Sequence, residues 1–241
     1  INFIIPNALA HLGKLDDAMK YARDGLDFAR RKKDRHAEAG SLTTLGLVAL
    51  EVEGPSSAYE YQKEALRLSK MGKDRILEAN ILDNLANAVG LSQGDYHAAH
   101  DYFEQARLIY SEYGSLSGKG HVMVNLGWGA SILGDYPAAM NYYEQALIIT
   151  LQMNSRMETM FTYVNLSLAA SAQNLVNYAL KWAHTALDFS IRIGDTIGEA
   201  WAYYCQGLAE LAGRQFENAV RSFLRSIEIR TALNALPLIA E

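Results

Sequence analysis

The sequence has little cysteine, no membrane-length apolar run and no excess of basic residues, and each shortage excludes a class of protein. A single cysteine, Cys205, among 241 residues cannot form an internal disulfide, which predicts a reducing, cytoplasmic location. No apolar run approaches the roughly 18 residues of a membrane helix, and no secretory leader is recognisable at the start, so we expect no membrane partner. The first residue is Ile1 rather than Met, and we interpret the chain as a piece of a longer protein.

The charge balance is mildly acidic, with 22 Lys and Arg against 27 Asp and Glu and a net charge of −5. Nucleic-acid-binding surfaces gather Lys and Arg, because the phosphate backbone attracts clustered positive charge. The one basic run, RRKKDR from Arg30, is interrupted by Asp34 and is interpreted as an exposed helix end. We therefore expect no direct nucleic-acid partner.

The chain repeats itself with a period of about 40 residues, the kind of period found in repeat architectures. GDYHAAHDYFEQARLI begins at Gly94 and GDYPAAMNYYEQALII begins at Gly134, with weaker copies from Gly13 and Gly213. One alanine recurs every 40 or 41 residues, at Ala18, Ala58, Ala99, Ala139, Ala179 and Ala219. This regularity predicts one structural unit repeated along the whole chain.

Each unit is predicted to be two helices joined by a short turn. In the first helix, large apolar residues stand three positions apart, as at Met123 and Leu126, and a small residue follows the second of them. Small side chains there let a neighbouring helix approach closely; they are Gly46, Ala86, Gly127 and Ser167. The second helix carries aromatic residues and alanines seven positions apart. We interpret the aromatic residues Tyr102, Phe103, Tyr142 and Tyr143 as core rather than as a cofactor site.

The turns between the two helices carry Gly-Asp-Tyr or a related sequence. Asp95 and Asp135 are predicted N-caps, and Pro137 fits the first turn of a helix, where its missing N–H costs nothing. The period places these turns near residues 13–16, 53–56, 93–96, 134–137, 174–177 and 213–216.

This pattern resembles the tetratricopeptide repeat over the whole chain, most completely from Leu126 to Ala146. The resemblance implies an all-α superhelical solenoid of antiparallel helix pairs, with about six repeats and no strand. Units of 40 residues, longer than the usual 34, are similar to those of kinesin light chains, of the Leu-Gly-Asn-rich spindle adaptor and of helical sensor regions in bacterial regulators. We expect a single array over residues 1–241, with repeats at 1–38 (partial), 39–78, 79–119, 120–159, 160–199 and 200–241.

Three departures from the repeat pattern stand out. Gln206 replaces the expected leucine in the sixth unit, and the third unit has one extra residue near Ser92. The first repeat lacks most of its first helix, and Pro6 falls in the part of that helix that remains.

The Gly-rich stretch GSLSGKGH, from Gly114 to His121, raises the question of a phosphate-binding loop. A phosphate loop has four residues between its glycines and Ser or Thr after the lysine, whereas Gly120 follows Lys119 here and no strand precedes the stretch. The repeat alignment places it between two units, so we interpret Gly114 as the end of a helix.

Other chemically suggestive groups are also incomplete. His97, His100 and Asp101 could share a metal on one helix, but a structural zinc site usually has four ligands. We find no nucleophile elbow and no catalytic set. Paired carboxylates such as Asp16 and Asp17 fall at a helix start, where the helix dipole accounts for them. The sequence therefore predicts no enzyme, no metal and no cofactor.

An asparagine recurs at one position of the first helix in three consecutive units. The position just before the apolar anchor holds Thr44, Asn84, Asn125, Asn165 and Cys205. Asparagine is a poor helix former, so its recurrence needs a reason. One reading is a hydrogen bond to a neighbouring helix, or descent from a duplicated unit. The other is a row of amides along a concave groove that bind the backbone of an extended peptide, as the resembling families do with such asparagines.

Neighbouring positions on the same predicted face give this groove its chemical character. The candidate groove residues are Asp83, Asn84, Asn87, His121, Asn125, Trp128, Phe161, Asn165, Leu168, Trp201 and Tyr204. They make the N-terminal part polar and acidic and the rest aromatic, although Trp128 and Trp201 could equally be core.

The composition of the groove indicates which kind of ligand it favours. Related chaperone-binding domains hold a terminal carboxylate with Lys and Arg, but the corresponding positions here are Thr43, Asp83, Val124, Val164 and Tyr204. We therefore expect a ligand with apolar and basic side chains.

The sequence predicts a non-enzymatic scaffold that binds a protein or peptide segment. The alternative is the sensor or oligomerisation segment of a larger bacterial regulator. The last helix is followed by the apolar TALNALPLIAE, and the chain opens with INFII, so we also expect self-association through the array ends unless both ends continue.

Overall fold

The computed structural model describes residues 9, 12–72 and 74–233, and all regular structure within these residues is helical. The expected all-α fold without strands is confirmed for this part of the chain. Its helices are α2 (Leu15–Lys32), α3 (Arg35–Val52), α4 (Pro55–Ser69), α5 (Arg75–Gln93), α6 (Tyr96–Glu112), α7 (Leu116–Ile132), α8 (Tyr136–Gln152), α9 (Arg156–Ala172), α10 (Val176–Ile193), α11 (Thr196–Ala212) and α12 (Phe216–Ala232).

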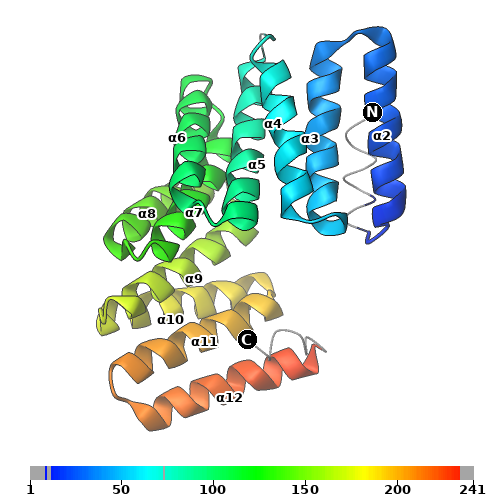
Figure 1. Ribbon diagram of the computed structural model, residues 1–241. Coiled ribbons are helices and arrows are strands. Elements are labelled where there is room, and N and C mark those ends of the chain that lie inside the picture. The colour runs from blue at the N-terminus through cyan, green and yellow to red at the C-terminus, as the bar shows by residue number, and fades with distance from the viewer. Residues whose placement is uncertain (1–8, 10–11, 73, 234–241) are drawn as a thin grey trace. The chain divides into compact units, whose positions relative to one another are not determined.

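The chain forms two compact units, Ile1–Val122 and Met123–Glu241, and the division falls within α7. In the first unit, each helix from α2 to α5 packs against the next one in the chain (Figure 1). In the second unit, α8 to α12 pack in the same sequential way. Within each unit, first helices of successive repeats also contact each other, namely α3 with α5 and α9 with α11. This arrangement is the helix-pair array that the period predicts, and the repeat boundaries themselves stay a prediction.

The turns lie where the 40-residue period places them, between α3 and α4, α5 and α6, α7 and α8, α9 and α10, and α11 and α12. Both predicted N-caps are confirmed. Asp95 accepts a hydrogen bond from the Ala98 amide at 2.9 Å, and Asp135 accepts one from the Ala138 amide at 3.1 Å. Pro137 lies in the first turn of α8, as expected.

The small residue of the first helix contacts a large residue of the second helix in the same repeat. A Cβ atom added at Gly127 would lie 2.5 Å from the Tyr143 ring, and one added at Gly207 would lie 2.7 Å from the Phe223 ring. Gly46 has the same relation to Gln62. The predicted close approach of neighbouring helices is therefore confirmed at Gly46 and Gly127, and Gly207 shows the same relation.

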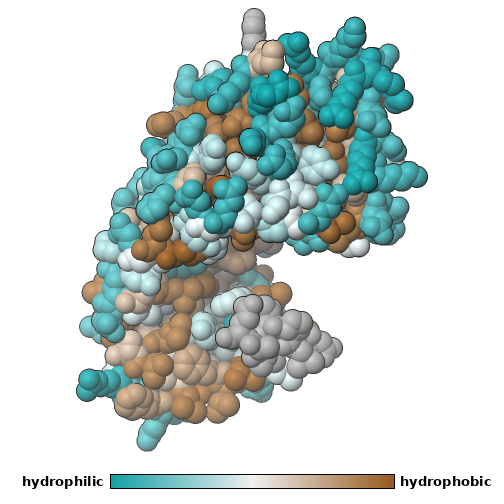
Figure 2. Space-filling view, viewed as in Figure 1, coloured by the Kyte–Doolittle hydropathy of each residue, from teal (hydrophilic) through white to brown (hydrophobic). Residues whose placement is uncertain are grey.

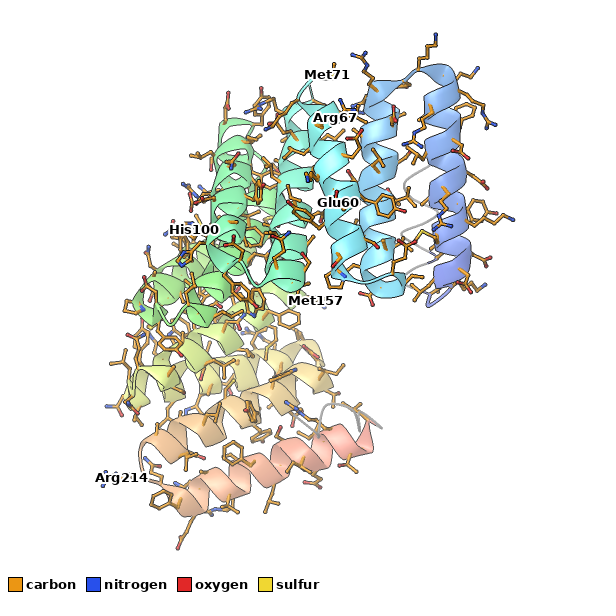
Figure 3. The ribbon with its side chains drawn as sticks, in the orientation of Figure 1. Glu60, Arg67, Met71, His100, Met157 and Arg214 are labelled. Atoms are coloured by element: carbon orange, nitrogen blue, oxygen red, sulfur yellow. The ribbon has the colours of Figure 1, made fainter. Side chains whose placement is uncertain are left out.

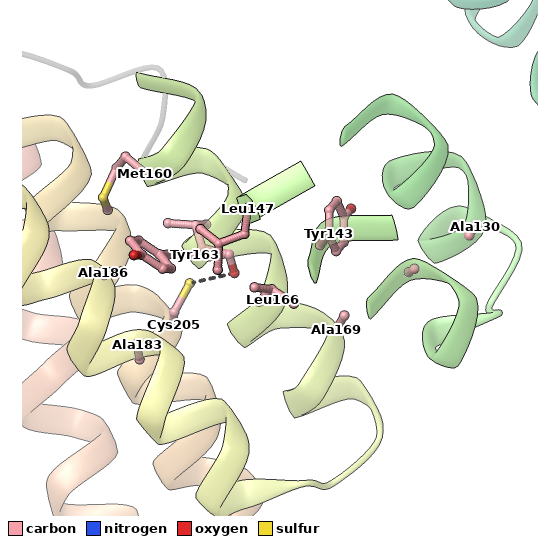
Figure 4. Close-up of a cluster of buried hydrophobic side chains, with 13 residues drawn as sticks. Ala130, Tyr143, Leu147, Met160, Tyr163, Leu166, Ala169, Ala183, Ala186 and Cys205 are labelled. Atoms are coloured by element: carbon pink, nitrogen blue, oxygen red, sulfur yellow. Dashed lines mark hydrogen bonds between the residues drawn. The ribbon is translucent and has the colours of Figure 1, made fainter. Parts of the chain in front are cut away.

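The core of the second unit gathers side chains from helices α7 to α11, which belong to three consecutive repeats (Figure 4). Tyr143 is 1% exposed and Leu166 is fully buried in this cluster. In the first unit, Phe103 is 2% exposed. Of the aromatic residues predicted to be core, Phe103 and Tyr143 are thus buried, and Tyr102 and Tyr142 are half-buried.

The two ends of the chain, including Pro6 and the last eight residues, lie outside the described residues. Among the described helices, none has the length and apolarity needed to cross a bilayer.

Candidate functional site

All eleven candidate groove residues lie on first helices of the repeats. Asp83, Asn84 and Asn87 lie on α5, and the others are carried by α7, α9 and α11. They divide between the two units, so each unit presents its own set of candidate side chains.

A cleft of about 470 Å³ opens between α3 and α5 in the first unit. Two of the candidate groove residues, Asp83 and Asn84, line it. The remaining lining residues are His36, Gly40, Thr43, Thr44, Leu47, Asp74, Ile76, Leu77 and Asn80. The wall is therefore mixed, with carboxylates, amides and hydroxyls beside aliphatic side chains.

Asp83 is the most buried charged group of this cleft, with 8% of its surface exposed. Its carboxylate lies 3.5 Å from the Nε2 atom of His121, so the structure brings together two predicted groove residues from successive repeats. Burial, together with the nearby Asp83 carboxylate, raises the pKa of Tyr110, whose hydroxyl donates a hydrogen bond to Asn80 at 2.6 Å. Asn87 donates to the backbone carbonyl of Asp83 at 3.0 Å. The cleft thus has two carboxylates, Asp74 and Asp83, each with a histidine nitrogen within 4.0 Å.

The second unit has an apolar surface in the corresponding place, where α9 faces α11. A small cleft of about 40 Å³ lies between Phe161 and Trp201, and Phe161 is 54% exposed. Met157 (71% exposed) projects from the first turn of α9 (Figure 3), and Ile197 is 57% exposed on α11. On the face seen in Figure 2, hydrophobic side chains gather over α9 to α12 and hydrophilic ones over α2 to α6.

The two aromatic candidates on α11 are partly covered by their own unit. The Arg230 guanidinium of α12 lies 4.3 Å from the Trp201 ring centroid and 5.6 Å from that of Tyr204. Tyr204 also contacts Phe223 on α12 at 5.8 Å between ring centroids. Trp201 and Leu168 pack against the buried cluster as half-buried side chains. Trp128, by contrast, is 41% exposed.

Three solved structures share this fold at low sequence identity. BtubC from P. vanneervenii is 21% identical, with a TM-score of 0.79 over 91% of this chain and 92% of that one. A signal transduction ATPase with a tetratricopeptide repeat sensor, from Pyrococcus horikoshii, is 15% identical, with a TM-score of 0.83 over 97% of this chain and 36% of that longer one. The tetratricopeptide-like repeats of a putative kinesin light chain from Podospora anserina are 14% identical, with a TM-score of 0.70 over 81% of this chain and 95% of that one.

Family models match two overlapping parts of the chain. Residues 77–150 match the model described as tetratricopeptide repeat. The chain is therefore an array of helix pairs similar to tetratricopeptide repeats. Residues 121–237 of the array also match the model described as 26S proteasome subunit RPN7. No curated protein matches the chain.

The asparagine position of the array borders the contact between successive first helices. Asn84, Asn125 and Asn165 are half-buried there, whereas Thr44 and Cys205 at the same position are 3% and 0% exposed. The Cys205 thiol lies 3.8 Å from the backbone carbonyl of Val164 in the preceding repeat, and burial raises the pKa of this thiol to about 12 (Figure 4). Side chains at this position can therefore contact a neighbouring helix or a ligand, and the amide row stays a prediction.

Several cleft residues of the array were not predicted from the sequence. Asn80 lies one turn before Asn84, and Met157 and Ile197 lie one turn before Phe161 and Trp201. A search for i, i+4 neighbours of each candidate would have found all three. His36 and Asp74 gave no such signal, because they reach the cleft from the starts of two different helices.

The Gly-rich stretch is a helix-to-helix connection of the array. Gly114 has a positive φ of 70° just after α6, and Ser115 Oγ accepts a hydrogen bond from the Gly118 amide at the start of α7, at 3.3 Å. The predicted helix end at Gly114 is confirmed. Among the described residues, no group of three or more His, Cys, Asp or Glu side chains is placed to hold a metal ion.

Proposed function

We propose that this array is a non-enzymatic scaffold that binds an extended segment of a partner protein along its first helices. The observation that carries the proposal is the cleft between α3 and α5, which contains the predicted groove residues Asp83 and Asn84. Its volume falls within the range of ligand pockets, about 300–1,000 Å³.

The chemistry of the first helices suits a peptide ligand. Asn84 and Asn165 are half-buried, and an amide side chain can both donate to and accept from a peptide backbone. Backbone contacts of this kind supply affinity with little dependence on sequence. Within the second unit, the exposed side chains of Phe161 and Met157 offer apolar area for side chains of a bound segment.

A peptide-selection experiment tests the proposal. The purified array is immobilised and presented with a phage library of random dodecapeptides, and selected peptides are then titrated in solution against Asn84→Ala. We expect selected peptides to lose several-fold in affinity, because one hydrogen bond in a partly dry site contributes about 1 kcal/mol. Asn141→Ala, which removes an exposed amide from the second helix α8, is the matched control and should leave affinity unchanged. A library that yields no binding peptide contradicts the proposal.

A second candidate function is a sensor segment within a larger signalling protein. The solved ATPase from Pyrococcus horikoshii favours it, because that protein has a tetratricopeptide repeat sensor and 97% of this chain aligns with 36% of it. Sequencing the complete gene tests this candidate, and an ATPase or DNA-binding region in the same reading frame would support it.

Self-association through the array is a further part of the proposal. The outer side of α12 exposes Phe216 (61%), Val220 (56%) and Leu224 (59%) along one stripe. Apolar stripes of this kind are covered by the next helix inside a repeat array. Light scattering across a concentration series should show a dimer that Leu224→Glu converts to monomer, and a constant monomer mass would contradict self-association.

A further inference from the structure

A second cleft, of about 310 Å³, lies in the second unit at the turn between α8 and α9. The end of α10 closes it, since α8, α9 and α10 pack in sequence there (Figure 1). We infer that this cleft binds an organic carboxylate with an apolar body, which can be a free acid or the C-terminal residue of a peptide. The site shares no residue with the α3–α5 cleft that carries the scaffold proposal.

Arg156 supplies a positive charge in the lining of this cleft. It is the first residue of α9, it is exposed, and within the described part of the chain its guanidinium has no carboxylate partner. The neighbouring Asn154 adds an amide to the same lining. A guanidinium presents parallel N–H donors that match the two oxygens of a carboxylate. Arg156 can therefore bind the carboxylate of a ligand without giving up an ion pair of the fold.

The start of α9 offers free backbone donors beside this guanidinium. At the starts of α5 and α11, Asp74 and Asp195 each accept a hydrogen bond from the amide three residues later. Ser155 holds this place in α9, but its hydroxyl donates to the Glu158 carboxylate and no side chain caps the helix. The Glu158 side chain does not line the cleft. The first amides of α9 can therefore donate to an anion, which the helix dipole also favours.

A buried hydroxyl without a partner marks the same cleft independently. Thr159 lines the cleft and is 1% exposed. Four other buried threonines donate to a backbone carbonyl of their own helix, namely Thr43, Thr44, Thr150 and Thr162. The Thr159 hydroxyl forms no hydrogen bond to any described residue. Because an unpaired buried polar group costs free energy, a ligand oxygen that accepts this hydroxyl would be stabilised.

Three apolar side chains complete the cleft. Phe189 and Ile193 line it from the last turns of α10, and Leu151 lines it from the end of α8. The Phe189 ring lies 5.6 Å from the Tyr163 ring between centroids, and the Arg192 guanidinium lies 5.3 Å from its centroid. An inorganic anion would leave these apolar side chains uncovered, whereas an acid with one aliphatic or aromatic group covers them. The volume, at the lower end of the range for ligand pockets, suits a ligand of this size.

The test compares defined probes on the purified array by two-dimensional NMR and isothermal titration. The probes are phenylbutyrate, its neutral counterpart phenylbutyramide, inorganic phosphate, and the peptide acetyl-Ala-Ala-Phe with a free or an amidated C-terminus. Arg156→Gln removes the charge, and Thr159→Val removes the hydroxyl at nearly constant shape. Arg31→Gln, which removes an exposed arginine from α2 in the first unit, is the matched control. Circular dichroism and thermal melting establish that each variant is folded.

We expect phenylbutyrate to shift the amide signals at the start of α9 and the end of α10, and to bind at least about tenfold more tightly than phenylbutyramide. Arg156→Gln should weaken phenylbutyrate by about tenfold and Thr159→Val by several-fold, whereas Arg31→Gln should leave the affinity unchanged. Thr159→Val should also keep or raise the melting temperature, because the fold loses no hydrogen bond with this hydroxyl.

Tighter binding of the free-acid peptide than of phenylbutyrate would support a peptide C-terminus as the ligand, and the reverse order would support a small free acid. The pocket would be overturned by equal binding of the acid and its amide, by phosphate binding as tightly as phenylbutyrate, or by wild-type affinity in both variants. The absence of binding by either acid up to millimolar concentration would also overturn it. A lower melting temperature of Thr159→Val would show that the hydroxyl is bonded within the protein, and this too would overturn the pocket.

Discussion

At the scale of single residues, glycines on first helices pack directly against large side chains of the neighbouring second helices. Gly127 on α7 meets the ring of Tyr143 on α8, and Tyr143 is 1% exposed. The Tyr143 hydroxyl lies 3.4 Å from the Ser131 hydroxyl, one turn after Gly127 on the same helix. Backbone, ring and hydroxyl contacts therefore act together at one point of the helix pair.

Gly127→Ala should destabilise the second unit by about 1–3 kcal/mol, the usual cost of overpacking a tight core. An added Cβ would lie within 2.8 Å of three atoms of the ring, which is itself 1% exposed. Gly129→Ala on the same helix is the control. No heavy atom lies within 4 Å of its added Cβ, so this change should stabilise α7 by about 0.5–1 kcal/mol. Urea unfolding measures both, and equal effects of the two substitutions would contradict the packing argument.

Because the Tyr143 phenol is buried, we also expect the folded protein to lose stability at high pH. Burial raises its pKa to about 12, above the ordinary value of about 10, so the folded state keeps the phenol protonated where the unfolded chain would ionise it. This contribution is complete below pH 10 and is lost as the pH rises from 10 to 12, by about 2–3 kcal/mol at most for two pKa units.

The Tyr143→Phe variant isolates this contribution. It should lose less stability than wild type between pH 10 and pH 12, as followed by urea midpoints at each pH. Tyr113→Phe removes a phenol that is 52% exposed and should leave the wild-type slope unchanged. Identical slopes for wild type and Tyr143→Phe would show that ionisation elsewhere controls alkaline unfolding.

At the scale of helices, aspartate side chains cap the starts of several helices of the array. Asp34, Asp74, Asp95, Asp135 and Asp195 each accept a hydrogen bond from the backbone amide three residues later. A cap satisfies one of the free amides at a helix start, and the carboxylate also complements the helix dipole.

Asp135→Ala should destabilise the array by about 1 kcal/mol, because the Ala138 amide loses its partner at the start of α8. Asp135→Ser keeps an oxygen acceptor at the same place and should recover most of this loss. Thermal melting of both variants tests the cap. A serine variant no more stable than the alanine variant would mean that the charge of Asp135, rather than its hydrogen bond, matters.

At the scale of the whole chain, the array combines two compact units with surfaces of different chemistry. The first unit offers a polar cleft with a buried carboxylate, and the second offers exposed Phe161 and Met157. In a repeat array each repeat contacts only its neighbours, so stability is close to a sum of local terms. A local substitution should therefore lower the stability of its own unit more than the stability of the other unit.

Tryptophan fluorescence reports the unfolding of the second unit alone, because Trp128, Trp182 and Trp201 all lie in that unit. Gln62 in the first unit is 2% exposed and donates to the Thr43 carbonyl at 3.0 Å, so Gln62→Ala should cost about 1–3 kcal/mol. We expect this variant to shift the urea transition seen by circular dichroism more than the one seen by fluorescence. Gly127→Ala should show the opposite order. Coincident shifts of both probes in both variants would indicate a single cooperative unit.

Asn125→Ala tests the amide row along the first helices. It should weaken binding of a selected peptide by about 1 kcal/mol, as for one hydrogen bond lost in a partly dry site, and barely change the melting temperature. Isothermal titration and thermal melting measure the two effects, with Asn141→Ala as control. If Asn125→Ala unfolds the array and the folded fraction binds as before, the asparagines are structural.

The helix pairs, their turns and their tight contacts were all predictable from the sequence. Asp95 and Asp135 act within three residues of their own position, so local spacing determines their role. Gly127 and Tyr143 lie in adjacent helices joined by a short turn, and the 40-residue period repeats the same relation at Gly46 and Gly207. Periodic, local interactions of this kind are visible in a sequence because each copy repeats the same evidence.

The tertiary structure decided which positions on the first helices are accessible to a ligand. Arg230 covers Trp201 from a helix that begins 15 residues later, and Cys205 is buried where Asn84 lines a cleft. Likewise, Asp83 meets His121 only because first helices of successive repeats lie side by side. The repeat and its helices can be predicted from the sequence alone, since they depend on periodic short-range contacts. The pocket and its charge depend on side chains that approach across repeats, and no periodic signal encodes those distances.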